Sequence, residues 1–241
     1  MTEEKKNLSI SGSGSAPGGC YEDVKISGSG KIQGDLICSS ININGSGRIT
    51  GDAKASNVMI SGSAVIEKRL IAESIIINGS CKAEEDVSGE RIQINGRGKV
   101  LGSIHGENVR VSGILSVDGD LEAEEVVAEG PVKIGGLCSA ERIDITLSGM
   151  ASHIKEIGCG TLNVHSRFTS ALFGQLLNAF SKRKLIADTI EGDNIVLEDT
   201  EAKVVRGNHV SIGAGCSIGR VYYKSDYKKD DKATVQSAVK E

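Results

Sequence analysis

The hydrophobic positions of this chain recur every seventeen residues. Written in rows of 17, the sequence aligns without insertion or deletion through eight rows, which begin at Val24, Ile41, Val58, Ile75, Ile92, Val109, Val126 and Ile143. Each row starts with Ile or Val, and a second apolar residue follows two positions later in every row but the seventh, which has Ala128 there. This period-two pair predicts the inward face of a short strand. A fixed period of this length indicates stacked structural repeats, and a β-sandwich does not predict it.

Glycine follows the first strand of nearly every row. It stands at Gly28, Gly45, Gly62, Gly79, Gly96, Gly113 and Gly130, and Leu147 is the exception. We expect glycine here to supply the backbone freedom that a sharp corner needs. Two further apolar columns, which contain Ile32 and Leu36 in the first row, complete three strands and three corners per coil. The sequence therefore predicts an all-β fold, a triangular β-helix (β-solenoid) of about twelve coils with one helical insertion.

The predicted boundaries follow from the repeat and from composition. We expect a flexible N-terminus at 1–6 and a β-helix domain at 7–223, with regular 17-residue coils over 24–159. Residues 224–241 are polar and charged, so we expect a disordered C-terminal tail.

An apolar stripe with helical spacing interrupts the coils at about 165–185. Its residues are Phe168, Leu172, Phe173, Leu176, Leu177 and Phe180. Burial of such side chains is favourable, so the stripe needs a cover. Three covers remain open: the side of its own solenoid, a partner or second protomer, and a membrane interface.

Composition limits the classes of function. Hydrophobic residues make up 39% of the chain and aromatic residues 3%, which favours a core of thin aliphatic layers. A net charge of -4 gives no reason to expect a nucleic-acid partner. The six cysteines lack CxxC pairing and are expected to be small buried residues in a reducing cytoplasm. No stretch has the apolar length of a signal peptide or membrane span, so we expect a cytoplasmic protein.

No catalytic, cofactor-binding or metal-binding motif stands out, so we expect no cofactor and no enzyme activity. The recurring GSG runs resemble phosphate loops, but their recurrence in successive coils indicates corners. One alternative is an enzyme: residues 210–219 resemble the hexapeptide rhythm of left-handed β-helix acyltransferases, beside His209. A second alternative is an adaptor solenoid that does not polymerise.

The open edges of a solenoid predict self-assembly, because each exposes unpaired backbone groups over a slice of core. We expect the polymerisation ends at Leu8 and Ile10 on one side and at Ile212, Ile218 and Val221 on the other. Head-to-tail docking of such ends is heterologous and gives an open filament.

Charges also form columns along the repeat. A basic column contains Lys31, Arg48, Lys82, Lys99 and Lys133, and an acidic column contains Glu73, Glu90, Glu107, Glu124 and Glu141. Two interpretations remain open: solvated corners that discourage aggregation, and lateral matching between neighbouring filaments.

The run IQGDLICSSININGSGRITGDAKASNVMISGSAVIEKRL, with its recurrent glycine and Gly-Asp corners, resembles the bactofilins, which are polymer-forming cytoskeletal proteins of bacteria. The resemblance covers roughly 24–142 well. It implies a right-handed β-helix that polymerises without nucleotide and scaffolds cell shape, envelope, appendage or motility machinery. The partners it implies are further copies of the chain, a paralogous bactofilin, and recruited envelope or motility proteins. It also implies a place at the inner face of the membrane, although MTEEKKNLSI does not match the hydrophobic N-terminal segment of the family.

Overall fold

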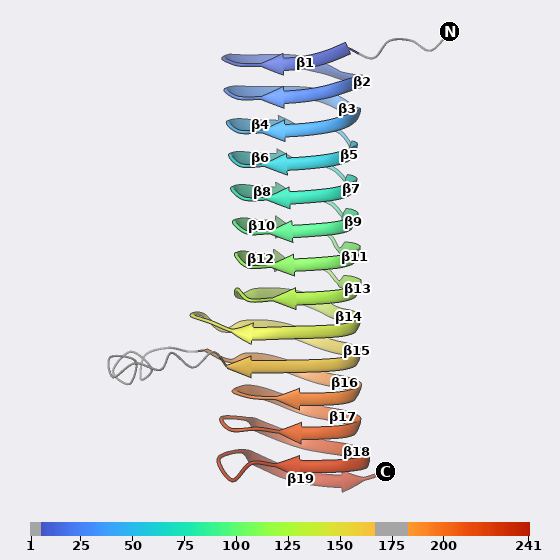
Figure 1. Cartoon of the computed structure of the whole chain (residues 1–241), viewed down its shortest axis with the longest axis vertical. Helices are drawn as coiled ribbons and strands as arrows, with labels where there is room; N and C mark the ends of the chain where they lie inside the picture. Colours follow the sequence, from blue (N-terminus) through green and yellow to red (C-terminus); the bar gives the residue numbers. More distant parts are fainter. Residues whose placement is uncertain (1–5, 167–182) are drawn as a thin grey trace. The chain divides into compact units, whose positions relative to one another are not determined.

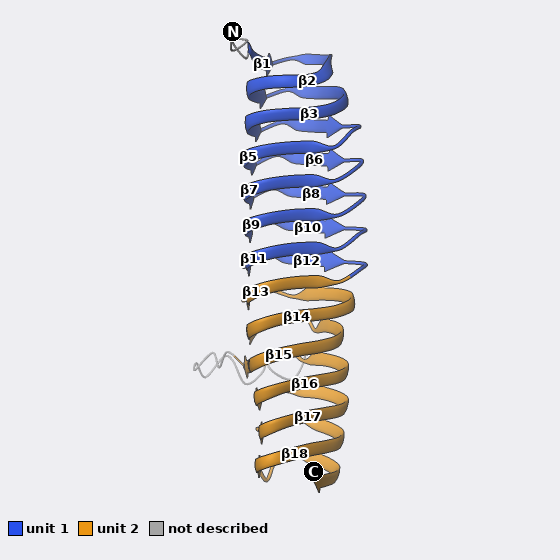
Figure 2. Ribbon diagram, turned by 90° about the vertical axis from the view of Figure 1, so that its right-hand side faces the viewer, with its two compact units in different colours: residues 1–119 blue, residues 120–241 orange. Residues whose placement is uncertain are grey.

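The computed structural model describes residues 6–166 and 183–241. Within them the chain is all-β, with no helix, and forms the stacked parallel coils of a β-solenoid of about 13 turns. The predicted fold class is thereby confirmed. The predicted insertion helix and its apolar stripe lie outside the described residues. The chain divides into two compact units, Met1–Gly119 and Asp120–Glu241 (Figure 2), and each is described by itself.

Unit 1 is a regular stack of parallel coils (Figure 1). Its strands are β1 (Lys6–Ile10), β2 (Ser13–Ile26), β3 (Ser29–Ile43), β4 (Ser46–Ile49), β5 (Ala53–Ile60), β6 (Ser63–Ile66), β7 (Leu70–Ile77), β8 (Ser80–Ala83), β9 (Val87–Ile94), β10 (Arg97–Val100), β11 (Ile104–Val111) and β12 (Ile114–Val117). Ile41 lies opposite Val58, and Val58 lies opposite Ile75. The 17-residue period is therefore the register of the sheet.

Each coil has three inward faces, but they come from fewer strands than the sequence predicts. In β5, Ala53 and Ala55 are buried, then Val58 and Ile60, with two solvent-facing residues between the pairs. The strand bends at these two residues and supplies two faces, while the four-residue β6 supplies the third. The backbone stays paired with the next coil on both sides of the bend, so it does not need a loop there.

The corner glycines are required for a different reason than the one the sequence suggested. A Cβ on Gly45 would lie 2.0 Å from the carbonyl oxygen of Gly28, and one on Gly79 would lie 1.9 Å from that of Gly62. Neither glycine has a positive φ. The expectation of special backbone freedom was wrong, because the constraint is the close approach of one coil to the carbonyl of the coil before it.

Aspartates at one corner of the coil tie that coil to the next. Asp35 Oδ1 accepts a hydrogen bond from the amide of Asp52 at 2.9 Å. Asp86 Oδ1 accepts one from the amide of Ser103 at 2.8 Å. Each bond spans one full period of the repeat, so the carboxylate satisfies a backbone donor at the equivalent corner of the following coil.

Unit 2 has longer strands and a variable period. Its strands are β13 (Leu121–Ala128), β14 (Val132–Leu147), β15 (Ser152–Ser166), β16 (Leu185–Leu197), β17 (Thr200–Ile212), β18 (Ser217–Lys229) and β19 (Thr234–Lys240). Ile143 lies opposite Leu162, which is a longer step along the chain than the period of unit 1. Ile195 lies opposite Val210, which is a shorter one. The predicted regular block over 24–159 is therefore too long.

Both predicted boundaries in the second half of the chain change. Strand continues to Ser166 and resumes at Leu185, so the ends of the predicted insertion at 165–185 belong to the coils. Residues 224–241 are not a disordered tail, since β18 continues to Lys229 and β19 adds a further strand. Ala233 is 6% exposed in this segment, and its burial stabilises the folded form of this charged sequence.

Candidate assembly edges and a surface groove

The N-terminal edge of unit 1 is an unpaired strand with apolar side chains. Strand β1 hydrogen-bonds to β2, with Leu8 opposite Val24 and Ile10 opposite Ile26, and no other described strand pairs with it. Val24 and Ile26 are fully buried, whereas Leu8 and Ile10 are half-exposed because no described coil covers them. These two residues lie where the sequence predicted an assembly end. Their edge combines free backbone groups with exposed core, which is the arrangement that templates strand addition.

The C-terminal edge of unit 2 is formed by residues that the sequence analysis assigned to a tail. Strand β19 pairs with β18, placing Val235 opposite Ile218 and Ala238 opposite Val221. Val235 is half-exposed and Ala238 is exposed.

The predicted end residues Ile212, Ile218 and Val221 lie inside unit 2. They are at most 1% exposed, because the last coil covers them. Their placement on an exposed end was wrong. The 17-residue spacing itself could have corrected it, since Ala233, Val235 and Ala238 follow Cys216, Ile218 and Val221 by one period.

Polar groups partly cover this C-terminal edge. Lys229 stands opposite Ile212, in a column that is apolar in the two preceding coils, and its Nζ donates to the carbonyl of Ala233 at 3.2 Å. The rings of Tyr223 and Tyr227 stack with centroids 5.2 Å apart. Burial raises the pKa of the Tyr227 hydroxyl, with a smaller contribution from Tyr223. The two described edges therefore differ: the N-terminal one is aliphatic and bare, and the C-terminal one is mixed.

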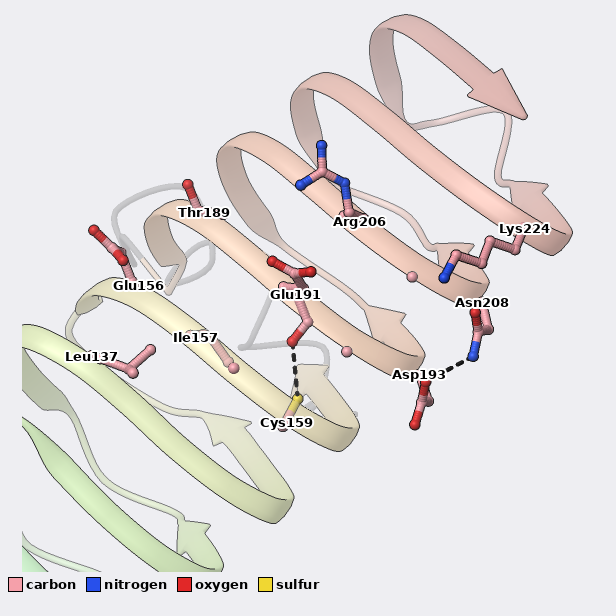
Figure 3. Close-up of a pocket in the computed structure, with 13 residues that line it drawn as sticks. Leu137, Glu156, Ile157, Cys159, Thr189, Glu191, Asp193, Arg206, Asn208 and Lys224 are labelled. Atoms are coloured by element: carbon pink, nitrogen blue, oxygen red, sulfur yellow. Dashed lines mark hydrogen bonds between the residues drawn. The ribbon is translucent and has the colours of Figure 1, made fainter. Parts of the chain in front are cut away.

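A groove of about 460 Å³ runs across the outside of unit 2 (Figure 3). Its lining comes from successive strands β14 to β18, and the small residues Cys159, Gly192 and Gly207 share one column in β15 to β17. Gly158, Gly192 and Gly207 form much of its floor, and Leu137 is an apolar wall residue that is 39% exposed.

Charges of both signs surround this groove. Glu156, Glu191 and Asp193 are acidic, and Arg206 and Lys224 are basic. Asn208 Nδ2 donates to Asp193 Oδ1 at 2.7 Å. Such a surface offers ion pairs and hydrogen bonds to a partner rather than an enclosed site for a small molecule.

Cys159 is a nucleophilic residue by type, but its surroundings suppress that chemistry. Burial, together with the nearby charges of Asp193 and Glu141, raises the pKa of its thiol to about 12. The thiolate is the nucleophile, and a thiol with this raised pKa is mostly protonated at neutral pH. Within residues 6–166 and 183–241, no group of three or more His, Cys, Asp or Glu side chains is arranged to hold a metal ion.

The remaining candidate residues are dispersed. His209 Nδ1 lies 2.9 Å from Asp226 Oδ2, with both side chains on the exposed surface of adjacent coils. None of the six cysteines, all of which lie among the described residues, forms a disulfide: Cys38, Cys81, Cys138 and Cys216 are buried, Cys159 is intermediate and Cys20 is exposed. The predicted stripe from Phe168 to Phe180 lies outside the described residues. No helix long and apolar enough to cross a membrane occurs in the part of the chain that the structure describes.

The fold and its edges place the chain in the class of parallel β-solenoids. Two proteins of Bacillus subtilis are similar to it in sequence. The uncharacterized protein YhbF is 43% identical over 98 residues, which is 41% of this chain and 39% of YhbF. The uncharacterized protein YhbE is 41% identical over 102 residues, or 42% of each chain. The matches thus span about two fifths of the length of these relatives. No protein-family model matches the chain, and no solved structure matches it.

Proposed function

We propose that this protein is a bactofilin-like scaffold that assembles with other copies of itself, without nucleotide, through the edges of its terminal coils. The observation that carries the proposal is the unpaired β1 strand with half-exposed Leu8 and Ile10. A strand from another copy would satisfy the free backbone groups and bury both side chains, each of which gains about 1.5–3 kcal/mol on full burial.

The second contact surface is the C-terminal edge formed by β19. Val235 and Ala238 replace Ile212, Ile218 and Val221 as the residues at this end. An N-terminal edge that binds the C-terminal edge of another copy makes a heterologous contact, which repeats into an open filament. If like edges bind each other instead, a filament forms only when N-terminal edges bind N-terminal edges and C-terminal edges also bind C-terminal edges.

The wider role follows from assembly. A polymer of this kind would act as a platform in the bacterial cytoplasm, at the inner face of the membrane, and recruit envelope or motility proteins. A paralogous bactofilin is a further candidate partner for the same edges. The proposal assigns no catalytic step, cofactor or nucleic acid to the chain.

The test is the substitution Ile10→Asp, with Ser9→Asp as its matched control. Both place a carboxylate on β1, but Ile10 faces the core column and Ser9 faces solvent. Negative-stain electron microscopy and sedimentation velocity should show filaments for the natural sequence and for Ser9→Asp. Ile10→Asp should give short species only, because a buried unpaired charge is costly.

Two results would overturn the proposal. One is filaments of normal length from Ile10→Asp. The other is a natural protein that stays monomeric at every concentration and salt, as an adaptor solenoid would. A thermal-denaturation curve of each variant separates loss of assembly from loss of fold.

A further inference from the structure

Unit 1 carries a basic column on the face formed by its short strands. Lys31 lies opposite Arg48, and Lys82 lies opposite Lys99, with Val65 between the two pairs. Arg48 and Lys82 form ion pairs with Glu67 and Glu84, each at 2.7 Å. Lys31 and Lys99 are exposed, and no carboxylate of the described chain lies within ion-pair distance of either.

An acidic column lies on a different face of the same unit. Glu73, Glu90 and Glu107 are exposed and occupy the same position in three successive coils. They form no ion pair with any described residue. Like charges one coil apart, at about 4.8 Å between strands, repel one another, and an opposite charge brought beside them relieves that repulsion.

An open groove of about 360 Å³ runs beside the acidic column. Its floor is made of the small residues Cys38, Ala55, Ala72 and Gly89, one from each of four successive coils. Ile37 and Ile71 line it, and Ile37 is 47% exposed. Glu73 and Glu90 supply its carboxylates, and Lys54, Ser56 and Ser88 complete the lining. The groove thus offers two apolar side chains and two carboxylates, with one lysine, Lys54, between Ile37 and Ile71.

A lysine side chain has the complementary chemistry. Its aliphatic stem packs on apolar surface while its ammonium stays at a charged or wet edge. The basic column and the acidic column have the same spacing of one coil, so the neighbouring Lys82 and Lys99 can face two neighbouring carboxylates, such as Glu73 and Glu90, at once. A single small cation would not contact the apolar side chains of the groove, and an apolar segment would not pair with its carboxylates.

We propose that unit 1 of one copy docks sideways on unit 1 of a second copy. The column of Lys31, Arg48, Lys82 and Lys99 lies in the groove lined by Ile37, Ile71, Glu73 and Glu90 and extended by Glu107. This contact adds a lateral direction to the end-on assembly proposed above, but it does not depend on it. Each exposed ion pair is weak, so the contact gains strength from repetition and is sensitive to salt.

The test is a charge-swap experiment with two double variants. Lys31→Glu with Lys99→Glu reverses the two cations of the basic column that have no carboxylate within ion-pair distance in the described chain, and Glu73→Lys with Glu90→Lys reverses the two carboxylates that line the groove. Each double variant alone should lose side-by-side association by about tenfold at low ionic strength, because like charges then face each other. An equimolar mixture of the two should regain it, because the reversed columns are again complementary.

The control is Lys25→Glu with Lys155→Glu, which changes the net charge by the same amount as the reversed basic column. Both lysines are exposed, and neither belongs to the groove or to the basic column. This variant should associate sideways like the natural protein. Paired filaments are counted by electron microscopy, and light scattering follows the salt dependence.

The same comparison in an Ile10→Asp background separates this proposal from the end-on one. There the lateral contact alone should give salt-sensitive oligomers in sedimentation velocity, whether or not filaments form in the natural protein. The proposal is overturned if the double variants associate as the natural protein does, or if their mixture fails to regain association.

Discussion

Units 1 and 2 are both stacks of parallel coils, but they keep their coils in place differently. In unit 1 every coil beyond β4 is an eight-residue strand and a four-residue strand separated by corners. In unit 2 single strands of 13 residues, such as β16 and β17, run around most of a coil. Leu185 lies opposite Thr200, so a coil of unit 2 can close with fewer residues than a coil of unit 1.

The difference lies at the corners. Unit 1 fills them with glycines that have no room for a Cβ and with aspartates that bond the next coil. In unit 2 the column of corner glycines ends, with Leu147 in place of the glycine. Residues with positive φ occur in both units, at Gly19 and Gly34 in unit 1 and at Gly149, Asp199 and Gly215 in unit 2. A solenoid can thus hold its register either by repeating an identical tight corner or by continuing its strands through the bend. The first way constrains the sequence much more strongly.

The largest expected effect comes from filling a unit 1 corner. Gly79→Ala puts a methyl group 1.9 Å from the carbonyl oxygen of Gly62, so the coils must separate there. We expect a loss of about 3 kcal/mol in the free energy of unfolding. Gly158→Ala in unit 2 is the comparison, since its Cβ would meet only Leu137 Cδ1 at 3.7 Å. Urea denaturation of both variants measures the loss in the free energy of unfolding. Equal losses for Gly79→Ala and Gly158→Ala would contradict the proposed difference between the two units.

A smaller effect is expected from the corner aspartates. Asp86→Ala leaves the amide of Ser103 without its acceptor and should cost about 1–2 kcal/mol. In unit 2, Asp188 forms an exposed ion pair with Lys203 at 2.7 Å, so Asp188→Ala should cost below about 0.5 kcal/mol. Urea denaturation at neutral pH tests both. A loss for Asp188→Ala as large as that for Asp86→Ala would show that the corner hydrogen bonds of unit 1 stabilise the fold no more than an exposed ion pair does.

The smallest effect is a dependence of stability on alkaline pH that both units should share. Burial raises the pKa of the thiols of Cys81 in unit 1 and Cys138 in unit 2 to about 12, against an ordinary value of 9.0. A raised pKa in the folded state means that the unfolded chain loses its proton first. Stability is therefore complete below pH 9 and falls as the pH rises toward 12.

Each thiol should lower the free energy of unfolding by about 1 kcal/mol at pH 10. Cys81→Ala should remove its share of that loss with little cost at pH 7, because Ala64 and Gly98 occupy the same column. Cys138→Ala should do the same at pH 10 but cost more at pH 7, because its neighbours are Leu121 and Ile157. Urea denaturation at both pH values checks this, and an unchanged alkaline loss in Cys81→Ala would contradict it.

The regular coils could be predicted from the sequence because their inward residues repeat at a fixed interval. Val24, Ile41 and Val58 define one column by their spacing alone, and the strands pair in that register. The third corner of each coil was predicted, but not that one strand runs through it, because the apolar pattern shows which side chains point inward and not where backbone pairing with the next coil stops. The role of Gly45 was misjudged, since room for a Cβ depends on the preceding coil rather than on the local sequence.

The candidate site was predictable at one edge only. Leu8 and Ile10 precede the first regular row in alternation, which is the pattern of an end strand. At the other edge, the charged residues around Tyr227 and Lys229 concealed a further coil whose inward residues Ala233 and Val235 keep the 17-residue spacing. The grooves could not be predicted, because a groove forms only where a column of small residues lies below the larger side chains on either side of it. The sequence shows the small residues but not these relative heights.

The corner glycines of unit 1 also bear on how a gene of this kind changes in length. Gly45, Gly62 and Gly79 each lie against the carbonyl of the corner glycine one coil earlier. A duplication or loss of 17 codons, or of a multiple of 17, brings another glycine against another carbonyl, whereas other numbers of codons shift the glycine away from it. Unequal recombination between rows can therefore lengthen or shorten unit 1 by whole coils in one event. The unequal spacings of unit 2 offer no such interchangeable block.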